Sequence, residues 1–368
     1  MKVGILTLYY KNHNYGGQLQ AYALCTYLNQ FSSVECEQIT YDYKGKKRRT
    51  AKGILFLLYS YLLHPKTMLG LQSRIKMFQA FEKAIPHSQL ISNPMELRQA
   101  AEKYDYIFTG SDQVWNQEYA GGAFFLSDIQ PDKRCAYAAS FGKDNVIDNL
   151  LTNNTVETLK NYRFLSVREE SAKKILEYYN IKGAKIACDP TLLLDSNEWE
   201  RQISHILPIT QDKYAFVYLL GNGKALRDDL KRKIRDESLK IVSIPHIHFS
   251  YQKRDRDFAD IEIYKAGPLE FLRLIKDATV VVTDSFHCTL FSILFQKNFW
   301  TLSRSSNPNA GSTNGRMYTL LDKVGLMNRY AGSVENIDIK AGLPSVSSKR
   351  KLFEYAENSR KLLSDFLI

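Results

Sequence analysis

Short apolar runs alternate with amphipathic stretches along most of this chain, a pattern typical of strands followed by helices. The clearest example begins at residues 279–283, where three valines lie between two threonines, as in a buried parallel strand. From Phe286 onward, apolar residues recur at helical spacing. The pattern therefore predicts a strand, a tight turn at residues 284–285, and a helix whose first turn carries His287.

The same alternation continues through two successive parts of the chain. In the first part, strands are predicted at residues 2–7, 38–43, 104–109, 134–139 and 164–167. In the second part, they are predicted at 214–220, 239–244, 279–283 and 298–303. Helices are predicted at 19–29, 54–63, 74–84, 95–102, 171–179, 225–237, 268–278, 316–324 and 349–367, besides the one that begins at Phe286. Strands that alternate with helices form parallel sheets covered on both faces.

The predicted fold class is α/β, with two Rossmann-like, doubly wound domains that face a cleft and a C-terminal helix. We expect an N-terminal domain over residues 1–195 and a C-terminal domain over 196–345, with a helix at 346–368 that packs across both. A chain of 368 residues is too long for one ordinary core, which agrees with two domains.

Composition narrows the class of protein. Hydrophobic residues make up 44% of the chain and aromatic residues 12%, which excludes a disordered protein. The net charge of +11 favours anionic partners. The basic residues are not interleaved with stacking aromatics, so we expect no nucleic-acid partner. The five scattered cysteines indicate buried, reduced thiols, and the first residues lack the apolar core of a signal peptide, so a cytoplasmic protein is expected.

Residues 44–63 add a candidate membrane-contact segment to this expectation of a cytoplasmic protein. Residues 44–52 contain six lysines and arginines, and residues 54–63 (ILFLLYSYLL) are apolar on all sides. A basic run beside an apolar helix is typical of peripheral contact with the anionic face of a membrane. A helix buried in the core, preceded by a solvated basic loop, fits the same residues. No apolar run reaches the roughly 20 residues that span a bilayer.

Two loops at predicted strand ends carry candidate acceptor-binding residues. The first loop leads into a helix through Asn14, Tyr15, Gly16 and Gly17, and its glycines either only make the turn or let a ligand approach the backbone. It is not a dinucleotide fingerprint, because it lacks the G-x-G-x-x-G spacing. The second loop follows residues 104–109 and offers a hydroxyl, a carboxylate, an amide and an indole, which suit a sugar unless they serve only the turn. These residues are Ser111, Asp112, Gln113 and Trp115.

His287 is the main catalytic candidate. The first turn of a helix offers free N–H groups and a partial positive charge, so a histidine there can meet an anion and transfer a proton. A histidine that is merely capped or packed at a helix start fits the same position. His246 and His248 lie two residues apart with no third ligand nearby, so no metal site is predicted.

Six segments together resemble the polysaccharide pyruvyl transferase family, in order from residue 2 to about residue 330. They are NYGGQLQAYAL (14–24), GSDQVWN (110–116), YAASFG (137–142), SVREESA (166–172), DPTLLL (189–194) and TDSFHCTLFSI (283–293). The resemblance implies a fold similar to GT-B glycosyltransferases. It implies transfer of pyruvate from phosphoenolpyruvate (PEP) to a sugar of a bacterial surface polysaccharide, such as a capsule or exopolysaccharide, or of its lipid-linked precursor, usually as a cyclic ketal.

The resemblance places the family's histidine at His287. Many members carry an arginine where this chain has Ser285 and a glycine where it has Cys288, so another arginine has to supply the missing charge. PEP carries a phosphate and a carboxylate, for which arginine forks are expected. The candidate PEP-binding residues are Ser285, Arg316, Asn314, Arg304 and Arg168.

The expected reaction protonates the methylene carbon of PEP, after which a sugar hydroxyl attacks C2 and a base takes its proton. His287 and Asp112 are the predicted catalytic residues, with Asp112 holding or deprotonating the acceptor. PEP is the donor substrate and no cofactor is expected. The N-terminal domain is expected on the acceptor side and the C-terminal domain on the PEP side. The alternatives are a GT-B glycosyltransferase that uses a nucleotide sugar and a non-catalytic saccharide-binding protein.

Overall fold

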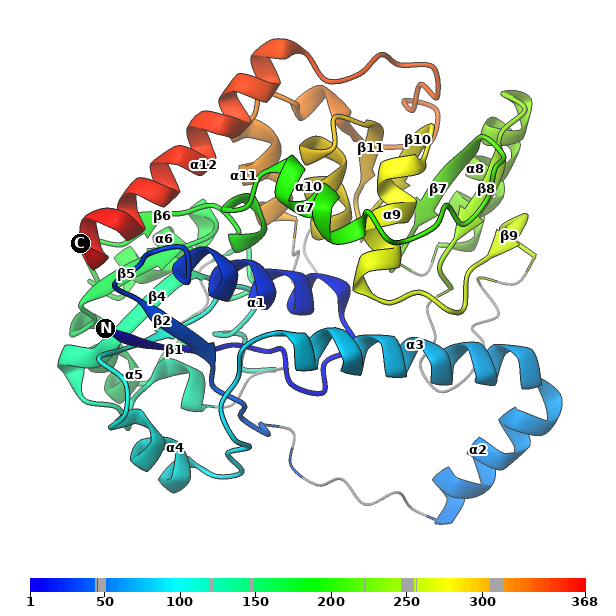
Figure 1. The fold of residues 1–368 in the computed structure, drawn as a ribbon. Helices are drawn as coiled ribbons and strands as arrows, with labels where there is room; N and C mark the ends of the chain where they lie inside the picture. Colours follow the sequence, from blue (N-terminus) through cyan, green and yellow to red (C-terminus); the bar gives the residue numbers. More distant parts are fainter. Residues whose placement is uncertain are drawn as a thin grey trace.

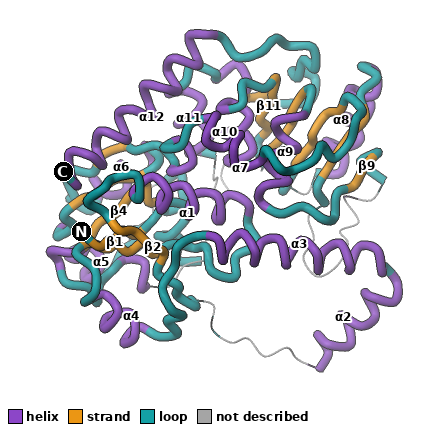
Figure 2. Tube along the Cα trace, viewed as in Figure 1, coloured by secondary structure: helices purple, strands orange, loops and turns teal. Residues whose placement is uncertain are grey.

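The computed structural model describes residues 1–43, 45, 51–118, 122–145, 148–221, 223–245, 255, 257–304 and 314–368. Most of the basic run at 44–52 lies outside the described residues, as do His246 and His248. In the described part of the chain, two parallel sheets are each flanked by helices (Figures 1 and 2).

The first sheet has six strands in the order β2-β1-β3-β4-β5-β6, and all neighbours are parallel. The strands are β1 (Lys2–Leu6), β2 (Glu35–Gln38), β3 (Tyr106–Thr109), β4 (Arg134–Ala139), β5 (Phe164–Val167) and β6 (Lys185–Ile186). The helices of this part are α1 (Tyr15–Leu28), α4 (Pro94–Ala101), α5 (Asn153–Lys160) and α6 (Glu170–Tyr178). β1 is buried from Val3 to Leu6 and lies between the edge strand β2 and β3.

The second sheet also has six parallel strands, in the order β12-β11-β10-β7-β8-β9. The strands are β7 (Tyr214–Tyr218), β8 (Lys240–Ser243), β9 (Ile261–Glu262), β10 (Val280–Thr283), β11 (Asn298–Leu302) and β12 (Tyr330–Ala331). The helices are α7 (Ser196–Ile203), α8 (Lys224–Asp236), α9 (Pro268–Asp277), α10 (Phe286–Leu294) and α11 (Gly315–Lys323). β10 is buried throughout between β7 and β11, so the prediction of a central strand followed by a helix is confirmed. The predicted α/β class with two doubly wound sheets is confirmed as well.

A long C-terminal helix, α12 (Val346–Leu367), contacts both domains. It packs against α10 and α11 of the C-terminal domain. On the other side, Arg360 Nε donates to the carbonyl of Leu193 at 3.0 Å, and Cys188 N donates to Ser359 Oγ at 2.9 Å. Four short 3-10 helices complete the described elements: Gly122–Phe125, Pro131–Lys133, Pro190–Leu192 and Met327–Arg329.

Two helices inserted between β2 and β3 reach across to the second domain. They are α2 (Ala51–Leu63) and α3 (Pro65–Ala84). Arg74 of α3 donates to the carbonyls of Tyr264, Pro245 and Ile263 at 3.0, 3.2 and 3.0 Å. α2 packs on α3 and projects away from both sheets (Figure 1). The interpretation of residues 54–63 as a helix buried in the core is therefore wrong, since Leu58 and Leu62 are 57% and 81% exposed.

Candidate active site

A cavity of about 980 Å³ lies between the two domains, beyond the carboxyl ends of β1, β3, β7 and β10. Ligands of open α/β sheets bind at this edge. From the N-terminal domain, its lining includes Asn14, Tyr15, Gly16, Asp112 and Gln113. From the C-terminal domain, it includes Ser285, His287, Arg304 and Arg316. The structure thus brings nine of the predicted site residues to one cavity.

His287 is fixed by the turn between β10 and α10. Asp284 accepts hydrogen bonds from the backbone N–H groups of Leu220 and Gly221, both at 2.7 Å, which ties this turn to the end of β7. Ser285 is the N-cap of α10 and accepts from Cys288 N at 3.5 Å. His287 follows in the first helical turn and is buried.

The imidazole of His287 lies directly against α1 of the other domain. A Cβ atom added to Gly16 would stand 1.9 Å from His287 Nδ1, much closer than any van der Waals contact. Glycine is therefore required at position 16 because a side chain there would occupy the place of the ring. The sequence left open whether Gly16 only makes the turn or faces a ligand, and in the structure it lines the cavity and faces the histidine.

The partner of His287 is a buried carboxylate of the N-terminal domain. His287 Nε2 lies 3.3 Å from Asp189 Oδ2. Asp189 also accepts from Arg168 at 2.8 Å, Ser111 Oγ at 3.2 Å and Thr191 Oγ1 at 2.8 Å. Burial by itself raises the pKa of Asp189, but His287 and Arg168 outweigh burial and hold that pKa well below its usual range. Asp189 is therefore a permanent anion beside the histidine.

No role for Asp189 was predicted from the sequence. Two features mark this residue as a candidate: it is the first residue of the segment DPTLLL, and it follows the end of β6. What the sequence does not contain is the contact itself, which joins two residues far apart in the chain and in different domains.

Arg168 lies behind the cavity wall and is almost fully buried. Its guanidinium is within 3.8 Å of Asp112, 3.5 Å of Glu169 and 2.8 Å of Asp189. Burial opposes its charge, yet the three carboxylates raise the pKa of Arg168 above its ordinary value. The predicted PEP-binding role does not fit this placement, since Arg168 does not line the cavity and holds carboxylates instead. Arg168 links Asp112 to Asp189. Because Asp189 contacts His287, this chain of contacts joins the two predicted catalytic residues, Asp112 and His287.

Arg304 and Arg316 present positive charge to the cavity. Arg304 donates to the carbonyl of Asp284 at 3.3 Å, while its buried Nε has no hydrogen-bond partner in the described part of the chain. Arg316 lies 5.7 Å from the ring centre of Phe286 and has no ion-pair partner among the described residues. Burial, followed by repulsion from Arg168 and Arg304, lowers the pKa of Arg316 to about 10. Arg316 therefore remains charged at neutral pH, and Arg304 Nε is a donor available for an anion.

Asn314 does not reach the cavity. Its side-chain amide donates to Ser303 Oγ at 3.0 Å. Its backbone N–H and that of Gly315 donate to the carboxylate of Asp144, at 3.0 and 2.8 Å. The N-terminus of α11 is thus occupied by a carboxylate from the other domain, so the predicted contact of Asn314 with PEP does not fit the structure.

The predicted acceptor residues divide into two groups. Asn14, Tyr15, Gly16, Asp112 and Gln113 line the cavity. Ser111 is buried, and its hydroxyl donates a hydrogen bond to Asp189. Gly17 is buried in α1, and its backbone N–H donates to Asn14 Oδ1 at 3.2 Å. Trp115 is 1% exposed, stacks on Phe125 and donates to the carbonyl of Phe124 at 3.2 Å. The prediction that Trp115 offers its ring to a sugar is therefore wrong.

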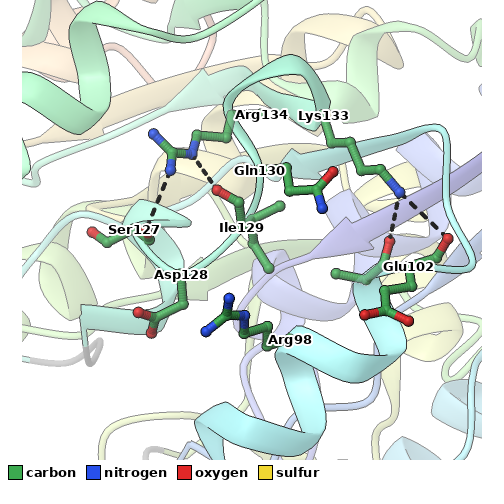
Figure 3. Close-up of a pocket in the computed structure, with 9 residues that line it drawn as sticks. Arg98, Glu102, Ser127, Asp128, Ile129, Gln130, Lys133 and Arg134 are labelled. Atoms are coloured by element: carbon green, nitrogen blue, oxygen red, sulfur yellow. Dashed lines mark hydrogen bonds between the residues drawn. The ribbon is translucent and has the colours of Figure 1, made fainter.

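A second, smaller cavity of about 360 Å³ shares no lining residue with the first. It lies beside α4 and the start of β4, and two of its basic residues, Lys133 and Arg134, donate to backbone carbonyls (Figure 3). Arg134 donates to Ile129 at 2.7 Å and Lys133 to Ala101 and Glu102 at 3.3 Å. No group of three or more metal-ligating side chains gathers within the described ranges.

Comparison with known proteins agrees with this geometry. A sequence model of the family described as polysaccharide pyruvyl transferase matches residues 14–306. A comparison with curated proteins found no match. Among solved structures, the chain is similar to UDP-GlcNAc 2-epimerase from Neisseria meningitidis bound to UDP-GlcNAc, with a TM-score of 0.55 and 12% identity over 98% of this chain and 94% of that one. It is also similar to UDP-N-acetylglucosamine 2-epimerase from Rickettsia bellii, with a TM-score of 0.51 and 10% identity over 99% and 96%. At such low identity the likeness shows the fold alone, a two-domain Rossmann-like fold of the GT-B type.

Proposed function

This chain belongs to the polysaccharide pyruvyl transferase family, and on that premise we propose that it transfers pyruvate from PEP to hydroxyl groups of a saccharide, forming a pyruvate ketal. The acceptor is a sugar of a bacterial surface polysaccharide or of its lipid-linked precursor. One observation supports the chemistry most strongly. A histidine beside a buried anion faces a cavity that also contains Arg316 and Arg304, and the buried Nε of Arg304 has no hydrogen-bond partner among the described residues.

The donor fits the C-terminal side of the cavity. PEP carries a phosphate and a carboxylate, and guanidinium groups bind both through paired, charge-assisted hydrogen bonds. Arg316 and Arg304 line this side, together with Ser285 at the start of α10. Arg316 supplies the charge that the family's usual position lacks here, because that position is Ser285. The reaction consumes PEP as donor and uses no separate cofactor.

His287 supplies the proton. Because Nε2 faces Asp189, the exchange of the proton with substrate falls to Nδ1, the other nitrogen of the ring. The protonated ring donates to the methylene carbon of PEP, and the double-bond electrons form the new C–H bond, which leaves C2 electron-deficient. The anionic Asp189 stabilises the imidazolium and fixes the orientation of its ring.

The acceptor enters from the N-terminal side. A sugar hydroxyl attacks C2 and its proton passes to Asp112, which lines the cavity and is 3.8 Å from Arg168. A second hydroxyl of the sugar then displaces phosphate, which leaves with the C–O electron pair and takes up the proton of that hydroxyl. The products are a ketal and inorganic phosphate, so one phosphate is released for each pyruvate transferred.

The test is incubation of the protein with PEP labelled in its pyruvyl carbons and a panel of free and lipid-linked saccharides. We expect label in the saccharide and an equal amount of released phosphate. Parallel reactions replace PEP with UDP-sugars. Consumption of a UDP-sugar, without label transfer from PEP on any acceptor, would contradict the proposal and favour a glycosyltransferase.

A further inference from the structure

The helices α2 and α3 expose an unusually large apolar surface. Leu55, Leu58, Tyr59 and Leu62 recur at positions i, i+3, i+4 and i+7, and so lie on one face of α2. Their exposed fractions are 70%, 57%, 58% and 81%. Leu63 and Leu69, at the junction with α3, are 53% and 57% exposed. Single exposed apolar residues are common in soluble proteins, but a continuous stripe marks a binding surface.

The segment of sequence that contains this stripe carries charge of one sign. Between Asp42 and Glu82 the sequence contains nine lysines and arginines and no acidic residue. Six of the nine precede or begin α2, in residues 44–52. An apolar protein partner would account for the leucines but not for the positive charge. An anionic lipid surface accounts for both, because the apolar face enters the acyl boundary while basic residues meet the headgroups.

The stripe is also close to the cavity. Leu71, Arg74 and Ile75 of α3 belong to the cavity lining. α3 begins at Pro65, and at roughly 1.5 Å per residue its start is only about 9 Å along the helix from Leu71. A saccharide whose lipid remained in a bilayer under α2 would therefore have its sugar near the cavity. None of the helices in the described ranges is long and apolar enough to cross a membrane, so the contact is with one surface.

We propose that α2 and the start of α3 dock the protein on an anionic lipid surface, with the face formed by Leu55, Leu58, Tyr59 and Leu62 turned into the bilayer. Docking is independent of the reaction. The role of docking in presenting a lipid-linked saccharide rests on the proposed function. Docking is therefore measured without PEP or saccharide, so that its failure and a failure of pyruvyl transfer are told apart.

The test is sedimentation with vesicles of phosphatidylcholine alone and of phosphatidylcholine mixed with phosphatidylglycerol. The full chain is compared with the double variant Leu58→Gln/Leu62→Gln and with a matched control, Leu207→Gln. Leu207 is 82% exposed and lies between α7 and β7, in the other domain. Melting temperature and the oligomeric state of each protein are measured on the same preparations.

We expect the parent and the control to sediment with anionic vesicles, less so at high salt, and to remain in solution with neutral vesicles. Losing two inserted leucines lowers the partition coefficient by about tenfold or more, with an unchanged melting temperature. Equal recovery of the parent with neutral and anionic vesicles would overturn the proposal. So would a double variant that binds vesicles like the control but changes from dimer to monomer, because the stripe would then be an interface between copies of this chain.

Discussion

Two residues of the opposite domain fix the position of His287: Gly16 packs against its ring, and the carboxylate of Asp189 lies beside Nε2. Gly16 leaves the space for the ring, and Asp189 Oδ2 lies 3.3 Å from His287 Nε2. Asp189 is in turn held by Arg168 and Thr191. A histidine at a helix start acquires a defined orientation and an anionic neighbour in this way, which the position in the sequence alone does not provide.

Asp189 gives a pH-dependent contribution to stability. A carboxylate with a depressed pKa in the folded state stabilises the protein above its unfolded pKa of about 3.9, and this stabilisation is lost as the pH falls through the folded value. Asp189→Asn removes the buried anion and leaves Arg168 and His287 less compensated. We expect the free energy of unfolding to fall by about 3 kcal/mol at neutral pH.

Urea unfolding of the parent and of Asp189→Asn at several pH values measures this effect. The difference between the two proteins should shrink progressively below about pH 4. Turnover of the folded variant should fall as well, because the ring loses its anionic support. A difference in stability that stays constant into the acid range would show that the charge of Asp189 is not its source.

Arg316 is the residue expected to bind the donor most directly. It is charged at neutral pH, since its pKa is lowered only to about 10, and its guanidinium has no ion-pair partner among the described residues. Arg316→Ala should weaken PEP binding by about 1.5–3 kcal/mol, the value of a charge-assisted hydrogen-bond set. Calorimetric titration with PEP measures it, with the exposed Arg98→Ala as control. An unchanged PEP affinity would remove Arg316 from the site.

At the scale of elements, the sequence predicted most of the strands and helices, but it missed the eight-residue helices α5 and α7 and the two-residue strands. β10 and α10 were identified because their apolar spacing is strong. β9 and β12 have two residues each, too few to show any period. The strand predicted at 38–43 is wrong except at Gln38, because the observed strand is Glu35–Gln38 and Tyr41 only forms an isolated bridge with Ile91. Pairing partners of this kind are set by tertiary structure.

The loop after β3 shows that adjacency in the sequence does not tell which side chains face the cavity. Sequence analysis grouped Ser111, Asp112, Gln113 and Trp115 because the four are adjacent in the chain. In the structure, Asp112 and Gln113 face the cavity, whereas Ser111 and Trp115 point into the protein. Asp112 has a φ of 70°, so the backbone turns there and sends neighbouring side chains in different directions.

The contact between α1 and α10 depends on the absence of one side chain. Gly16→Ala would place a methyl group 1.9 Å from His287 Nδ1, so either the ring or α1 has to move. We expect turnover to fall strongly while PEP affinity changes little. The control is Gly332→Ala, where an added Cβ would have no atom of the described residues within 4 Å. Steady-state kinetics on both variants decides, and equal turnover of the two would contradict the tight approach.

At the scale of the whole molecule, the active site exists only where the two domains meet. Arg74 of α3 binds three carbonyls of the C-terminal domain, and Arg360 of α12 binds the N-terminal domain. These links hold His287 against Gly16 and Asp189. The sequence predicted two facing domains and a cleft, which the structure confirms, but the residues that meet across the cleft follow from how the domains close.

The central claim is that His287 carries out proton transfer in pyruvyl transfer from PEP. The most direct test measures melting temperature, PEP affinity and initial rate on one preparation of His287→Asn. Asparagine keeps some hydrogen bonding, so the variant should fold normally and bind PEP within about tenfold of the parent. A positioned acid or base is worth roughly 10²–10⁴ in rate, and turnover should fall by that factor. Turnover close to that of the parent, with a lowered melting temperature, would make His287 a structural residue and contradict the account.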